Sequence, residues 1–152
     1  MHERLYRSAN VHSVDLAAYL ADVCADLAAL ATQATVQFAS ADPIVMSTDR
    51  CVRVALLLTE LVTNAAKHAR PGTACTVWVS LKRVGDDAIS LSVRDNGGGL
   101  PNNFEIVNSK GLGMKLVSAL VSQTGGTIRA AGNQLGVEFI AVIPIEQNAA
   151  RS

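Results

Sequence analysis

Two pairs of strand-like segments, each joined by a short turn, constrain the fold of this chain more than any other feature. Cys75 to Leu81 and Ala88 to Val93 are apolar with a period near two, and Gly85-Asp86 between them favours a tight turn. The second pair consists of Thr127 to Ala131 and Val137 to Ile143, joined around Gly132-Asn133. Strands joined by short turns pair antiparallel, so much of any sheet must be antiparallel.

Apolar residues at helical spacing predict three helices, over Ser13 to Thr32, Thr48 to Ala69 and Met114 to Gln123. Ser13 is the expected N-cap of the first helix, and Thr48 or Asp49 that of the second. Gly125-Gly126 should end the third helix. Two further strands are expected, at Thr35 to Ala39 and Ile44 to Met46.

The predicted order is helix, strand, strand, helix, strand, strand, loop, helix, strand, strand. Because hairpins join most strands, we expect an α/β (α+β) two-layer sandwich, with a mixed, mostly antiparallel sheet and helices on one face. A doubly wound parallel sheet would need a helix between nearly every pair of strands. We expect residues 13–146 to form one domain, after a helix end or linker at 1–12 and before a disordered tail at 147–152.

Composition narrows the functional classes. The 152 residues are 49% hydrophobic, which allows a real core, and thirteen basic residues balance thirteen acidic ones. No net charge attracts nucleic acid or anionic lipid, and no apolar run is long enough to span a bilayer. Cys24, Cys51 and Cys75 lack the spacing of a metal site, so we expect buried thiols and a cytoplasmic location.

The second predicted helix carries an unusual polar face. Glu60, Asn64, Lys67 and His68 fall within one arc of roughly 100°. The opposite face, which should pack on the sheet, carries Val52, Ala55, Leu58, Leu61 and Val62. A carboxylate and an amide oxygen four residues apart can share a Mg²⁺ or its water shell, and a lysine can meet phosphate. The alternative is an ordinary solvated face, with His68 interacting with the helix dipole.

Two glycine-bearing segments follow. Asp95 ends a strand-like segment, and its carboxylate could accept a hydrogen bond from an exocyclic amine such as that of adenine. Gly97 and Gly99 would let the backbone pass close to a flat ring. Gly111 and Gly113 open a helix whose first N–H groups could attract phosphate. A plain turn and close helix packing are the alternatives, and neither a Walker A loop nor a Rossmann fingerprint is present.

In order and spacing, these three segments resemble the Bergerat-fold, or GHKL, ATP-binding family, which includes DNA gyrase, heat-shock ATPases and histidine kinases. Glu60, Asn64 and Lys67-His68 resemble its N box, and Asp95-Asn-Gly97-Gly-Gly99 its first glycine box. Gly111-Leu-Gly113 resembles the second glycine box. The likeness covers about residues 13 to 146, and the first twenty residues are most similar to sensor histidine kinases of the HWE-like subgroup.

The resemblance implies a role for each matching residue. Asn64 would ligate Mg²⁺, Glu60 would orient water or the phosphoacceptor, and Lys67, with His68 beside it, would contact phosphate. Asp95 would bind the adenine amino group. The remaining expected contacts are Gly97, Gly99, Gly111 and Gly113, which would shape the pocket and its lid, and Asn96 and Lys110 close by.

Two departures from the family pattern stand out. Phe104 is the one candidate for a phenylalanine box in a short lid, and a simple hydrophobic plug is an equal interpretation. Gly136-Val137-Glu-Phe139 stands where many relatives have Gly-Thr-x-Phe, so Val137 supplies no hydroxyl to the pocket.

Our main hypothesis is that the chain is the catalytic domain of a two-component sensor histidine kinase.

Such a domain would bind Mg·ATP and transfer the γ-phosphate to a histidine on a separate dimerisation domain, whose hairpin residues 1–12 would end. A response regulator would act downstream, and we expect no contact with nucleic acid or membrane. The alternatives are an anti-sigma-factor serine kinase, which shares the boxes, and a degenerate docking module that has lost ATP.

Overall fold

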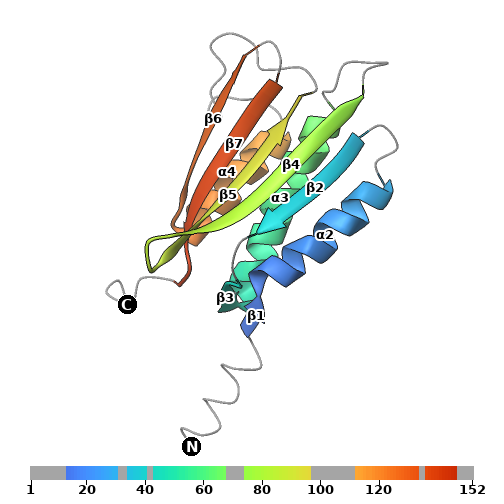
Figure 1. The fold of residues 1–152 in the computed structure, drawn as a ribbon. Helices are drawn as coiled ribbons and strands as arrows, with labels where there is room; N and C mark the ends of the chain where they lie inside the picture. Colours follow the sequence, from blue (N-terminus) through green and yellow to red (C-terminus); the bar gives the residue numbers. More distant parts are fainter. Residues whose placement is uncertain are drawn as a thin grey trace, which may run out of the picture.

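The computed structural model describes residues 13–30, 34–40, 43–67, 74–96, 112–133 and 136–146. The elements in chain order are β1 (Ser13–Asp15), α2 (Leu16–Leu30), β2 (Ala34–Ser40), β3 (Val45–Ser47), α3 (Thr48–Lys67), β4 (Cys75–Val84), β5 (Ala88–Asp95), α4 (Leu112–Thr124), β6 (Thr127–Asn133) and β7 (Gly136–Pro144). Figure 1 shows helices α2, α3 and α4 layered against one side of the large sheet. None of the described helices is long and apolar enough to cross a membrane.

The large sheet has five strands in the order β2-β4-β5-β7-β6. Strand β2 is parallel to β4, and the pairs β4–β5, β5–β7 and β6–β7 are antiparallel. The helical crossover through α3 accounts for the one parallel pair, because it returns the chain to the same end of the sheet. The predicted two-layer sandwich with a mixed, mostly antiparallel sheet is therefore confirmed.

A second, small sheet changes where the first two helices begin. Strand β1 pairs antiparallel with β3, so Ser13 lies opposite Ser47. Helix α2 therefore starts at Leu16, and Asp15 caps it by accepting hydrogen bonds from the N–H groups of Ala17 (3.1 Å) and Ile44 (3.3 Å). The predicted N-cap at Ser13 is wrong, because the pairing with β3 keeps Ser13 extended.

The N-cap of α3 is also one residue from its predicted place. Ser47 Oγ accepts the N–H of Arg50 at 3.3 Å, which is the usual N-cap contact with the third residue of a helix. Thr48 and Asp49, the predicted caps, lie in the first turn of α3. The hydroxyl that ends β3 therefore satisfies one of the free N–H groups of the helix.

The end of α4 follows the prediction from Gly125-Gly126. Gly125 has a φ of 77°, its N–H donates to Ser122 O, and the N–H of Gly126 donates to Val121 O. These two bonds form a Schellman motif, whose left-handed position glycine fills without strain. The predicted turn at Gly132-Asn133 is wrong, because these residues continue β6 and pair with Val137 and Gly136.

The core lies between the helices and the sheet. Helix α3 contributes Cys51, Val54, Ala55, Leu57, Leu58, Leu61 and Val62, and the facing strands contribute alternate residues such as Val77, Leu91 and Ala141. Val52 was expected on this face but is 41% exposed. It is rotated roughly 200° from Val54, so the two side chains cannot face the same layer.

The three cysteines are buried, as expected, and burial raises the pKa of Cys24 and Cys51 to about 11.

Arg50 is a charged residue inside this core, only 6% exposed. Its guanidinium donates to Thr124 O, the last residue of α4, at 2.7 Å, and to Pro144 O, the last residue of β7, at 2.6 Å. One side chain near the start of α3 thus ties together the ends of two other elements. Charge-assisted hydrogen bonds of this kind are stronger than neutral ones.

Replacing Arg50 with leucine should lower the free energy of unfolding by about 3 kcal/mol, because two charge-assisted bonds are lost and two carbonyls lose their donor. Urea unfolding followed by circular dichroism measures this change. Arg53→Leu, one turn further along α3 at a half-buried position, is the matched control and should change stability by less than about 0.5 kcal/mol. Equal stability of Arg50→Leu and wild type would contradict a net stabilising role for these contacts.

Candidate functional site

Three strand ends meet the C-terminal half of α3 at one end of the molecule, the upper end in Figure 1. Strand β5 ends there at Asp95, which pairs with Val77 near the start of β4 and with Val137 near the start of β7. Helix α3 packs on β4, β5 and α4. The candidate residues of the N box and of the first glycine box therefore belong to elements that contact one another.

Asp95 is the buried carboxylate of this end. It is only 6% exposed, and it continues the inward alternation of Ile89, Leu91 and Val93 along β5. Directly paired residues of neighbouring strands project to the same face, so its two neighbours in the sheet are the buried valines Val77 and Val137. The predicted position at a strand end is confirmed, and it places a carboxylate beside apolar walls.

The pKa of the Cys75 thiol depends on this carboxylate. Burial raises the pKa of Cys75, and the negative charge of Asp95 raises it further. Cys75 is 2% exposed at the first position of β4. A thiol with a raised pKa stays protonated at neutral pH, so Cys75 contributes a small neutral side chain near Asp95.

Gly136 allows the backbones of β5 and β7 to approach closely at Asp95. A Cβ on Gly136 would collide with Asp95 O, and it would lie 3.1 Å from Asp95 C and 3.2 Å from Asn96 Cα. No side chain fits there unless the backbone moves. Gly136 is therefore required by the close approach of two strands at the candidate site, and its φ is not in the left-handed region.

The polar face of α3 is partly exposed. Glu60 and Asn64 are half-buried, and Lys67, the last residue of the helix, is exposed. The buried face of the same helix packs toward the sheet through Leu57, Leu58 and Leu61. Glu60 and Asn64 thus lie at the border between core and solvent, where side chains can reach a ligand. His68 lies outside the described residues.

The second glycine segment is described only in part. Helix α4 begins at Leu112, so Gly113 lies in its first turn, as predicted for a helix that opens at this segment. The buried residues Met114, Val117, Leu120 and Val121 fix the helix against the core. Gly97, Gly99, Lys110 and Gly111 lie outside the described residues, as does Phe104.

The sequence interpretation missed two features of this fold. Arg50 could have been recognised, because it falls on the apolar stripe of Val54, Leu57 and Leu61, and a lone arginine on such a stripe indicates a buried charge. The need for glycine at position 136 had no local signal. The expected place of Asn96 near the ligand stays a prediction, and its side-chain carbonyl accepts the N–H of Thr76 at 2.8 Å.

Comparison with known proteins decides the family. Residues 50–147, more than half of the chain, match the model of the histidine kinase-, DNA gyrase B- and HSP90-like ATPases. The chain belongs to this ATPase family. Membership implies ATP binding, and the described strand ends and helices are those on which the family-like motifs lie.

Relatives of this ATPase domain are sensor kinases. The domain is 29% identical over 104 residues to the sensor histidine kinase PdtaS of Mycobacterium tuberculosis. The match covers 66% of this chain but 21% of that protein. The histidine kinase domain of the Erythrobacter litoralis EL346 blue-light-activated kinase has a TM-score of 0.79 at 24% identity, covering 87% of this chain and 66% of that one. The mycobacterial sensor histidine kinase MprB has a TM-score of 0.70 at 21% identity. The match covers 90% of this chain and 98% of that one. The chain thus spans about a fifth of the length of PdtaS.

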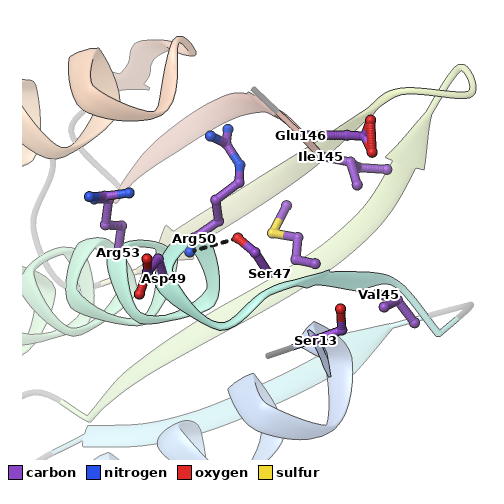
Figure 2. A pocket seen from close by; sticks show the side chains of 9 residues that line it. Ser13, Val45, Ser47, Asp49, Arg50, Arg53, Ile145 and Glu146 are labelled. Carbon is purple, nitrogen blue, oxygen red and sulfur yellow. Dashed lines mark hydrogen bonds between the residues drawn. The ribbon is translucent and has the colours of Figure 1, made fainter. Parts of the chain in front are cut away.

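A groove lies at the other end of this ATPase domain. It has a volume of about 450 Å³ and is lined by Ser13, Val45, Met46, Ser47, Asp49, Arg50, Arg53, Ile145 and Glu146. Figure 2 shows Arg50 and Arg53 on α3, with Glu146 across from them. Asp49 and Lys67 lie at opposite ends of α3, roughly 27 Å apart along its axis. This groove is therefore separate from the candidate nucleotide site.

Gly136→Ala should lower both stability and ATP affinity, because the added methyl group pushes β7 away from Asp95. We expect a loss of about 1–3 kcal/mol in the free energy of unfolding and weaker binding of ATP by calorimetry. Gly85→Ala is the control, since Gly85 has a φ of 62° at the far turn and its Cβ would meet nothing closer than 4.0 Å. Gly85→Ala should lower the free energy of unfolding but leave ATP affinity unchanged. Equal ATP affinity in the two variants would contradict the role assigned to Gly136.

Proposed function

We propose that this ATPase domain is the catalytic domain of a two-component sensor histidine kinase of the HWE-like subgroup. It would bind Mg·ATP and transfer the γ-phosphate to a histidine on a separate dimerisation domain. The observation that carries the proposal is the buried Asp95 at the end of β5, flanked by Val77 and Val137 and adjoining the α3 helix of the N box. The named relatives support the histidine kinase assignment.

Asp95 suits recognition of adenine. A carboxylate accepts hydrogen bonds and donates none when ionised, and the exocyclic amine of adenine is a donor. The valine side chains on both sides offer apolar surface to a flat ring. Guanine carries a carbonyl acceptor at the corresponding position, so the carboxylate would discriminate against it by repulsion.

The phosphate end would lie along the polar face of α3. Asn64 would ligate Mg²⁺, Glu60 would orient the incoming histidine, and Lys67 with His68 would contact phosphate. Among the described residues, no cluster of three His, Cys, Asp or Glu side chains forms a metal cage. Magnesium in phosphoryl-transfer sites typically takes one or two protein ligands and completes its shell with phosphates and water, which fits a single amide on α3.

Catalysis would rest on positioning and charge neutralisation. When bound, Mg²⁺ would neutralise charge that develops on the phosphates. Gly97, Gly99, Lys110, Gly111 and Gly113 would shape the remaining contacts, with the N-terminal turn of α4 directed at phosphate. Glu60 would hold the acceptor imidazole in line with the γ-phosphate, which is where orientation contributes most to the rate. The response regulator and the cytoplasmic location remain predictions.

Asp95→Asn should weaken ATP binding roughly 30-fold, because a charged acceptor is lost and an amide N–H₂ faces the adenine amine. Isothermal titration calorimetry with ATP measures the change. Asp87→Asn, an exposed carboxylate in the turn at the far end of the sheet, should leave affinity unchanged. Unchanged affinity in Asp95→Asn would remove Asp95 from the adenine site, and no binding of ATP by wild type would overturn the function.

Asn64→Ala should abolish the effect of Mg²⁺ on ATP binding while leaving adenosine binding intact, because adenosine has no phosphate for the metal to bridge. Titrations of ATP with Mg²⁺ or with a chelator, and of adenosine, separate the two effects. Thr63→Ala, at the exposed neighbouring position, is the control. Retention of the Mg²⁺ effect in Asn64→Ala would contradict a ligand role for Asn64.

The acceptor is tested by incubating wild type with labelled ATP and a histidine-bearing dimerisation domain. Label in acid-labile phosphohistidine would support the proposed function, and Asn64→Ala should transfer none. Label in acid-stable phosphoserine on a protein substrate would replace the histidine kinase assignment with the serine kinase alternative.

A further inference from the structure

The last rung between β4 and β5 is closed by a side chain. The N–H of Asn96 donates to Thr76 O at 3.3 Å, and the N–H of Thr76 donates to Asn96 Oδ1 at 2.8 Å. Thr76 and Asn96 continue the register in which Val77 faces Asp95. In a regular antiparallel pair the second bond would be accepted by the backbone carbonyl of the facing residue. Here the side-chain carbonyl of Asn96 takes that place.

The use of a side-chain carbonyl in place of a backbone carbonyl has a consequence for the strand end. The N–H of Thr76 keeps an acceptor, so β4 loses no ladder bond. The N–H of Thr76 is bonded to the side chain of Asn96, so this rung does not require the backbone carbonyl of Asn96 as its acceptor. Asparagine is suited to this role because its short side chain carries a carbonyl group equivalent to that of the backbone.

A second contact holds the same peptide from the opposite side. Gly136 of β7 lies against Asp95 O and Asn96 Cα so closely that it has no room for a side chain. The Asp95–Asn96 peptide is thus fixed between the Thr76 rung on β4 and the backbone of β7. The direction of the Asp95 side chain depends on this peptide, because the backbone atoms of Asp95 define the starting point of the side chain.

We propose that Asn96 is a positioning residue, which closes the β4–β5 ladder with its side chain so that the Asp95 carboxylate is presented to adenine. This inference rests on the proposed function. It differs from the expectation that Asn96 contributes to the ligand pocket itself, because its carbonyl oxygen is engaged by Thr76.

Three variants test the proposal. Asn96→Ala removes the acceptor, whereas Asn96→Asp keeps an oxygen at the same position and loses the N–H₂ group. Thr76→Val is the matched control, since it changes the side chain of the same rung but keeps the N–H and C=O groups that contact Asn96. ATP affinity is measured by calorimetry. Exchange of the Thr76 amide is followed by NMR.

Asn96→Ala should bind ATP about 3- to 10-fold more weakly, the equivalent of one hydrogen bond, and should exchange the Thr76 amide at least several-fold faster. Asn96→Asp should retain slow exchange, and Thr76→Val should retain both wild-type affinity and slow exchange. Thermal melts of all four proteins show whether an affinity change occurs in a folded domain, because binding is measured well below the melting temperature.

Each other result overturns the proposal in a different way. Wild-type affinity in Asn96→Ala would remove its positioning role while leaving the proposed function intact. Weak ATP binding by Asn96→Ala with a wild-type exchange rate at the Thr76 amide would make the side chain of Asn96 a direct ligand contact. A wild-type protein that binds no ATP, yet shows the expected exchange rates, would overturn the function and leave Asn96 a purely structural clamp.

Discussion

The register of β4, β5 and β7 determines how this domain can hold a charge at the edge of its core. It places Asp95 between Val77 and Val137, on the face of the sheet that the helices cover. A carboxylate in such surroundings loses much of its hydration, which costs several kcal/mol unless other groups compensate. A shift of one residue would turn Asp95 to the solvent face and Arg94 toward the core. The site therefore depends on the register, and the register depends on the apolar alternation of the three strands.

Arg50 and Asp95 illustrate two uses of a buried charge in one fold. Arg50 donates two hydrogen bonds from its guanidinium to the carbonyls of Thr124 and Pro144, and these bonds tie the end of α4 and the end of β7 to the start of α3. Asp95 lies at the opposite end of the sheet, where β4, β5 and β7 present their ends beside α3. The bonds of Arg50 to backbone carbonyls serve stability, whereas Asp95 lies at the end of the core where we propose that a nucleotide binds. The structure thus separates the anchoring end from the candidate binding end by the length of α3.

The sequence predicted those features that depend on neighbours along the chain. The hairpin through Gly85-Asp86, the end of α4 at Gly125 and the place of Asp95 at a strand end follow from local periodicity and turn chemistry. Ser13 was misplaced because its conformation is set by pairing with Ser47 of β3, which is distant in sequence. The turn near Gly132 was misplaced because β6 and β7 continue to pair beyond it. The rung between Thr76 and Asn96 could not be predicted, since an asparagine before a glycine run is equally typical of a ligand contact and of a turn.

Val137 shows why a family motif needs its structural context. The register places it directly beside Asp95, so the missing hydroxyl of the Gly-Thr-x-Phe pattern would have lain next to the carboxylate. Val77 on the other side is equally apolar, and both neighbours therefore offer methyl groups where a polar residue could have oriented the acid. Gly136 approaches the backbone of Asp95 on one side, and the Thr76–Asn96 rung secures it on the other. In this chain, the geometry of the strand end is therefore a constraint on how Asp95 would meet a nucleotide in the proposed site.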